Sequence, residues 1–145
     1  MSFASRTLFP AALLLVLAWA GQPMMSFAMQ PRAGGPQAER PPRLSNKWRL
    51  EFSGAAESAG EIVLEIVPKG EAPVRVRAVI ERNDGENRVA RKVKTAIDRQ
   101  AGRWVDAELD DGEDVLVKRN LFRPRVSVRL VSNTVKDVRI NFDRE

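Results

Sequence analysis

The stretch EIVLEIVPKGEAPVRVRAVIERNDGENRVARKVKTAIDRQA, residues 61–101, decides the fold because its apolar period changes along its length. In its first half, apolar side chains occupy every second position, which is typical of strands with one buried face. Proline and glycine within 68–73 favour a hairpin loop between two such strands. From Val89 onward, apolar residues recur at the spacing of one helix face, so the sequence predicts a helix at about 84–101.

The predicted helix has signals at both ends. Asn83 and Glu86 have the spacing of a capping box, in which each side chain bonds a free backbone N–H of the first turn. Gly102 is expected to stop the helix. The apolar stripe is too narrow for a helix that is buried on all sides, so we expect the helix to lie across one face of a sheet.

Alternating apolar and polar residues predict strands through the rest of the domain, and Asp-Gly at 111–112 favours a second hairpin. The expected strands are 48–52, 62–67, 74–80, 104–109, 115–118, 126–131 and 138–142. With the helix, the order is βββαββββ, which predicts an α+β fold with a mostly antiparallel sheet of about seven strands and one amphipathic helix packed on a face. A β-sandwich is the alternative if the helix does not form.

The N-terminus has the features of an export signal. Arg6 precedes an apolar run of 13 residues, from Leu8 to Ala20. Small residues allow cleavage after Ala20 or Ala28, so we expect a signal peptide at 1–20 or 1–28 and a secreted or periplasmic protein. An N-terminally membrane-anchored protein is the alternative. A disordered spacer rich in proline and glycine is expected at 29–45, and a single α+β domain at 46–145.

Composition excludes several kinds of chemistry. The 145 residues include no His and no Cys, and the formal net charge is +5. The chain therefore has no imidazole base, no thiol nucleophile, no disulfide and no His or Cys ligand for a metal. What remains is chemistry by carboxylates, amines and hydroxyls, and we expect neither an enzyme nor a cofactor.

Six carboxylates gather within nine residues around the second hairpin. The metal-ligand candidates among them are Asp106, Glu108, Asp110 and Asp111. Calcium takes six to eight oxygen ligands, but the spacing does not match an EF-hand loop. Carboxylate-pair catalysis needs two acids at a fixed separation beside a cleft, and a turn tip in a small domain offers little cleft. We therefore expect these acids to form the solvent side of a hairpin, with no metal.

Basic residues form the candidate binding patch for an anionic partner. They are Arg88, Arg91, Lys92 and Arg99 on the helix, and Arg123 and Arg125 after the second hairpin. The planar guanidinium group of Arg suits carboxylates and phosphates. From Asn46 onward, however, 20 basic residues face 18 acidic ones, and the chain has no Tyr for base stacking. A nucleic-acid partner is therefore not expected.

Together these features predict an exported, non-catalytic interaction domain of the cell envelope or surface that binds an anionic partner. That partner is expected to be an unidentified protein or an anionic envelope polymer. One alternative is a structural or appendage subunit that self-associates through its oppositely charged segments or its unpaired strand edges. The other is a small secreted hydrolase that depends on carboxylates.

Overall fold

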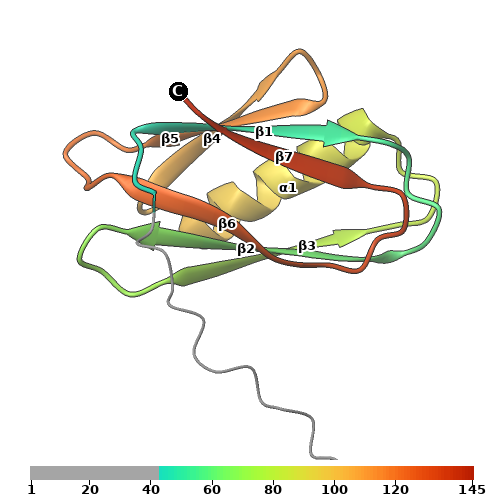
Figure 1. The fold of residues 1–145 in the computed structure, drawn as a ribbon, viewed down its shortest axis with the longest axis horizontal. Coiled ribbons are helices and arrows are strands. Elements are labelled where there is room, and N and C mark those ends of the chain that lie inside the picture. Colours follow the sequence, from blue (N-terminus) through green and yellow to red (C-terminus); the bar gives the residue numbers. More distant parts are fainter. Residues whose placement is uncertain (1–42) are drawn as a thin grey trace, which may run out of the picture. The chain divides into compact units, whose positions relative to one another are not determined.

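A computed structural model describes residues 43–145 and confirms the α+β class (Figure 1). Within them it contains seven strands and one helix, in the predicted order βββαββββ. They are β1 (Lys47–Ser53), β2 (Gly60–Pro68), β3 (Val74–Ile80), α1 (Glu86–Ala101), β4 (Val105–Asp110), β5 (Asp114–Arg119), β6 (Val126–Asn133) and β7 (Arg139–Arg144).

The seven strands divide between two antiparallel sheets, where the sequence suggested one. Their orders are β4-β5-β1-β7 and β3-β2-β6. The division arises because β1 pairs with β5 on one side and β7 on the other, so β2 pairs with β3 and β6 instead. At Gly54, where the chain leaves β1, φ is +86°, a backbone conformation that glycine adopts without strain.

The hydrophobic core lies between the two sheets and the apolar face of α1. Alternate side chains of the strands point inward, among them Leu50 of β1, Ile62 of β2 and Val115 of β5, and all three are fully buried. Trp48 is also buried, and its indole Nε1 donates a hydrogen bond of 2.9 Å to the carbonyl oxygen of Val126. This bond satisfies the only polar group of a large core side chain. Trp104 is only partly buried and packs at the margin of the core.

Helix α1 packs against both sheets, with contacts to β3 of one and to β4, β5 and β1 of the other (Figure 1). The side-chain amide of Gln100 accepts a hydrogen bond from the backbone N–H of Arg77 in β3 and donates one to its carbonyl, at 3.0 and 2.9 Å. On the other side, Asp98 accepts a bond of 3.2 Å from the N–H of Ala107 in β4. The helix thus occupies backbone groups on two edge strands that could otherwise pair with another chain.

The predicted capping box is wrong, although the helix ends at Ala101, just before Gly102, as expected. The N-cap residue is Gly85, which has no side chain to cap the first turn. Asn83 has φ +70° and its N–H bonds the carbonyl of Ala56, so it belongs to a turn that fastens the helix start to the β1–β2 loop. Tertiary contacts, which the local spacing does not record, thus set this helix end.

Both predicted hairpins form. In the first, β2 and β3 place Glu65 opposite Arg75, with 3.7 Å between a carboxylate oxygen and the guanidinium group. In the second, Asp111, Gly112 and Glu113 form the loop between the paired residues Asp110 and Asp114, and Asp111 and Gly112 have positive φ values of 49° and 86°.

The predicted signal peptide lies outside the described residues, as does the spacer up to residue 42. Ser45, at the end of the predicted spacer, forms a two-way backbone bridge with Val126, so strand pairing starts one residue earlier than the expected domain boundary. Helix α1, the one helix within residues 43–145, is not long and apolar enough to cross a membrane.

Candidate functional site

A basic groove runs between strand β3 and helix α1, and we call it the α1–β3 groove. Small buried side chains, Ala78 and Ala96, form part of its lining. Five cationic side chains line it against a single acid, Glu81. The cations are Arg77 from β3 and Arg88, Arg91, Lys92 and Arg99 from α1. The groove therefore presents positive charge above a small apolar surface.

The cations of the groove differ in their partners. Lys92 Nζ lies 2.6 Å from the Asp84 carboxylate and 3.0 Å from that of Glu81, so its charge is largely neutralised. Arg77 lies 3.3 Å from a Glu61 carboxylate oxygen. Arg91 and Arg99, in contrast, form no ion pair with any acid of residues 43–145, and both are exposed. These two side chains remain available to an external anion.

The spacing of these residues gives the groove its length. Residues 88, 91, 92, 95 and 99 fall on one side of an α-helix because they recur every three or four positions. At a rise of about 1.5 Å per residue, the row from Arg88 to Arg99 extends for about 16 Å. A row of this length suits several charges of an extended ligand better than one small anion.

Asp84 pairs with two cations of the groove, Lys92 and Arg88. Its side chain is only 2% exposed, and Oδ2 accepts hydrogen bonds from Lys92 Nζ and from the backbone N–H of Glu81. Burial acts to raise the pKa of this carboxyl, but the bonds from Lys92 and Glu81 and the charge of Arg88 outweigh it. The pKa of Asp84 is therefore lowered, and the same pair raises the pKa of Lys92.

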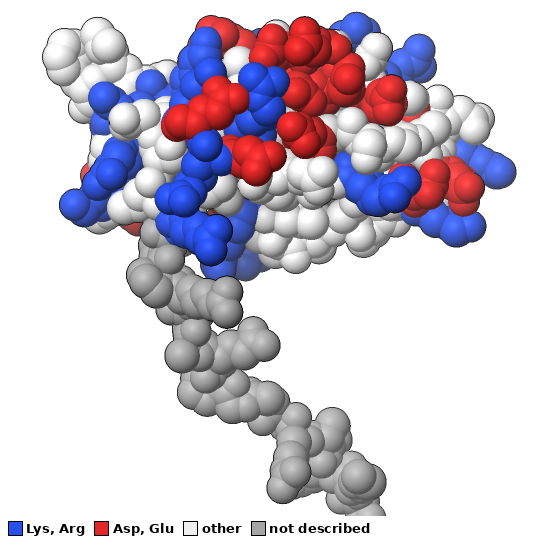
Figure 2. All heavy atoms as spheres, turned by 45° about the horizontal axis from the view of Figure 1, so that its top comes forward, with Lys and Arg blue, Asp and Glu red and all other residues white. Residues whose placement is uncertain are grey.

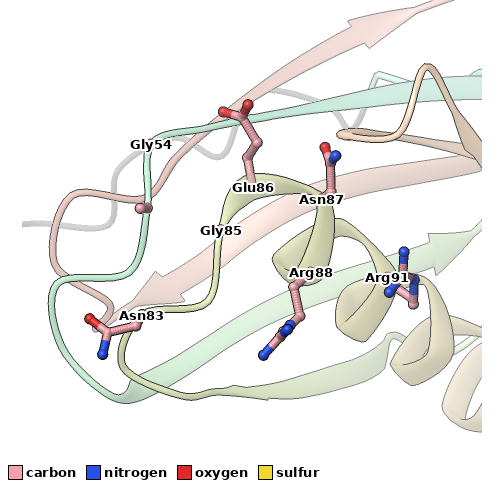
Figure 3. Close-up of a pocket in the computed structure, with 8 residues that line it drawn as sticks. Gly54, Asn83, Gly85, Glu86, Asn87, Arg88 and Arg91 are labelled. Atoms are coloured by element: carbon pink, nitrogen blue, oxygen red, sulfur yellow. The ribbon is translucent and has the colours of Figure 1, made fainter.

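A second hollow lies at the N-terminus of α1, next to the β1–β2 loop (Figure 3). Gly54, Gly85 and Asn87 line it, and Arg88 and Arg91 line both this hollow and the α1–β3 groove. Figure 3 shows Glu86 and Arg88 projecting from the first turn of α1 in opposite directions. Because Glu86 places a carboxylate at the helix N-terminus, this hollow is less suited to an anion than the groove.

The structure divides the six predicted binding residues into two groups. Arg88, Arg91, Lys92 and Arg99 all line the groove, whereas Arg123 and Arg125 lie in the β5–β6 loop and do not. Arg77 was missed as part of the groove because its place opposite the helix depends on long-range packing. Leu121 and Phe122 were also missed, although two large apolar residues between Asn120 and Pro124 are an unusual loop composition.

The predicted acidic residues lie on the outer face of the β4-β5-β1-β7 sheet and in its hairpin turn (Figure 2). Arg49 lies 3.0 Å from Asp110 and 2.8 Å from Asp114, and Lys118 pairs with Glu108. Hydrogen bonds to Glu145 and Asp114 raise the pKa of Arg49. Asp106 and Asp111 project into solvent. Nowhere in residues 43–145 are three acidic side chains grouped so that they could hold a metal ion.

The side chains that line the groove are suited to binding an anion. The groove's two neutral polar side chains are already committed, since Thr95 Oγ1 donates to the carbonyl of Arg91 and Gln100 bonds the backbone of Arg77. The exposed guanidinium groups of Arg91 and Arg99 can each bind a carboxylate or phosphate in a bidentate way. No protein-family model, no curated protein and no solved structure matches this chain, so its function is inferred from these surfaces.

Proposed function

We propose that this chain is an exported, non-catalytic interaction domain of the cell envelope or surface, and that it binds an anionic polymer in the α1–β3 groove. The observation that carries the proposal is that Arg91 and Arg99 line one groove and pair with no acid of the described residues. The export signal expected in residues 1–28 supports a place outside the cytoplasm.

A polymer fits the groove better than a compact ligand. The row of basic residues extends for about 16 Å along α1, and small side chains leave room for the body of a chain between the helix and β3. The arginines are exposed, so each contact is weak and affinity depends on several of them acting together. Binding of this kind is screened by salt, with a Debye length of about 8 Å at physiological ionic strength.

The double change Arg91→Gln and Arg99→Gln is expected to weaken binding to heparin, used as a model polyanion, about tenfold. Each lost contact of an exposed Arg is worth about 0.7 kcal/mol, and two give about 1.4 kcal/mol, a factor of about ten. The measurement is the dissociation constant by calorimetry at low salt, together with the salt concentration that elutes each protein from immobilised heparin. Unfolding curves check that both proteins are folded.

The matched control is Arg139→Gln and Arg144→Gln, which removes the same charge from exposed positions of β7. The affinity of this variant for heparin should fall less than about threefold, because the change weakens the long-range electrostatic field of the domain and removes no direct contact in the groove. If the two double variants bind heparin equally well, net charge explains the binding and the proposed groove site is wrong.

A self-associating subunit is the second candidate. One chain carries both the basic groove and an acidic sheet face, on which Asp106 pairs with no base of the described residues. Contacts between such unlike surfaces of successive copies build rings or filaments. The edges of β3 and β4 offer little support for strand addition, because Gln100 and Asp98 already occupy backbone groups there. Salt-sensitive growth of the sedimentation coefficient with concentration would favour this candidate.

A further inference from the structure

The β5–β6 loop, residues 120–125, holds two large apolar side chains out in solvent. Leu121 is 80% exposed and Phe122 is 94% exposed, the two highest values among the large apolar residues described. They occupy the centre of a turn that is closed by a 3.0 Å hydrogen bond from Arg123 N–H to the carbonyl of Asn120. Phe122 has φ +61°, a left-handed conformation that a bulky side chain rarely adopts.

Hydrogen bonds from both sides hold this turn in place. The backbone N–H of Asn120 bonds the carbonyl of Trp104 at 2.9 Å, and its side-chain amide bonds the carbonyl of Gly102 at 2.8 Å. Arg119 Nη1 donates to the carbonyl of Arg123 at 3.0 Å. The strained backbone at Phe122 is thus fixed by its surroundings, and such strain is concentrated at functional sites.

Five basic residues lie in or next to the loop that carries the exposed pair. They are Arg103, Arg119, Arg123 and Arg125, with Lys69 of the β2–β3 turn, whose N–H bonds the carbonyl of Arg125 at 2.9 Å. None of the five forms an ion pair with an acid of residues 43–145. Figure 2 shows an uncharged protrusion at the end of the domain where Figure 1 places the β5–β6 loop, with basic side chains beside it.

Trp104 lies at the base of the same loop. Its partly buried ring has the guanidinium carbon of Arg103 at 4.9 Å and that of Arg123 at 5.4 Å from its centroid. Tryptophan and arginine together are typical of surfaces at the level of lipid headgroups, because the ring is amphipathic and the guanidinium group binds phosphate.

We propose that the β5–β6 loop docks this domain on a bilayer that contains anionic phospholipid, with Leu121 and Phe122 inserted among the acyl chains. The unpaired cations provide the charge complementarity, since juxtamembrane Lys and Arg are attracted to anionic lipid surfaces. A convex tip of two side chains is small for a protein interface, which buries about 800 Å² on each partner. Insertion into lipid needs no matching pocket.

The test uses the natural absence of Cys from the chain. In the full chain, Leu121→Cys is labelled with the fluorophore NBD, whose emission rises and shifts to shorter wavelength in an apolar environment. We expect both changes on addition of phosphatidylglycerol vesicles and not with phosphatidylcholine vesicles. The matched control is the same label on Val79→Cys, an exposed position of β3 in the α1–β3 groove, which should not respond.

Two further changes, made in the protein labelled at position 121, test the aromatic side chain and the cations of the loop separately. Phe122→Gly removes the aromatic side chain and suits the positive φ, so the fold is retained, and the half-saturating lipid concentration should rise about tenfold. The double change Arg123→Gln and Arg125→Gln should also raise it about tenfold. Arg91→Gln with Arg99→Gln should leave it within about twofold, so this inference and the proposed function fail separately.

Three results would overturn the inference. The first is an unchanged NBD signal with phosphatidylglycerol vesicles, which would leave a protein pocket as the partner of Phe122. The second is an equal response to phosphatidylcholine, which would remove the role of the cations. The third is an equal response at Val79→Cys, which would mean that another part of the chain brings the whole domain to the membrane.

Discussion

The change Asp84→Asn is expected to lower the free energy of unfolding at pH 7 by about 2–3 kcal/mol, the value typical of a hydrogen bond to a charged group. Asn can still accept the bond from the Glu81 N–H, but it cannot neutralise Lys92, whose Nζ lies 2.6 Å from the carboxylate. Chemical denaturation monitored by circular dichroism measures the effect. In a Lys92→Gln background the same change should cost clearly less, because the ion pair is already broken.

The free energy of unfolding that Asp84→Asn removes should depend on pH. The pKa of Asp84 in the folded protein lies below its ordinary value, so the carboxylate contributes stability above the unfolded pKa of about 3.9. That contribution is lost as the pH falls through the lower, folded pKa. The difference between wild type and Asp84→Asn should therefore be constant from about pH 7 to 5 and shrink below about pH 4. A difference that persists undiminished at pH 2 would show that charge is not its origin.

The change Leu50→Ala is expected to lower the free energy of unfolding by about 3–5 kcal/mol. Leu50 is completely buried at the centre of β1, which pairs with β5 and β7, so its loss leaves a cavity between the sheets. A domain of this size is stable by about 5–15 kcal/mol, so the variant should unfold at a much lower denaturant concentration.

The control for Leu50→Ala is Val79→Ala, at an apolar position that is 70% exposed. It should change the unfolding free energy by no more than about 0.5 kcal/mol. If Leu50→Ala costs less than about 1 kcal/mol, Leu50 does not lie in a packed core, and the arrangement of the two sheets described above is wrong.

Local patterns in the sequence were sufficient to predict the elements of the fold. The alternation in 61–80 predicted β2 and β3, and their pairing places Glu65 opposite Arg75. The helical spacing from Val89 predicted α1, and Asp-Gly at 111–112 predicted the second hairpin. Each of these features depends on residues close together in the chain, where the period of apolar side chains and the preferences of turn residues act directly.

Features that depend on distant residues could not be predicted in this way. The partners of β1 are β5 and β7, which lie far along the chain, and no local pattern records that choice. The same is true of the helix start, where burial of Asp84 and the contact of Asn83 with Ala56 replace the expected capping box. Four cations of the candidate site were predictable from their helical spacing, whereas Arg77 on the opposite wall was not.

The most direct test of the proposed function is an NMR titration of the ¹⁵N-labelled full chain with a heparin hexasaccharide at low salt. If the anionic polymer binds in the α1–β3 groove, the largest shift changes should fall on the amides and side chains of Arg91 and Arg99 and on the neighbouring part of β3. Changes at these positions should fade with added salt. Changes centred instead on the β5–β6 loop, or spread evenly over the basic residues of the domain, would contradict the groove as the binding site.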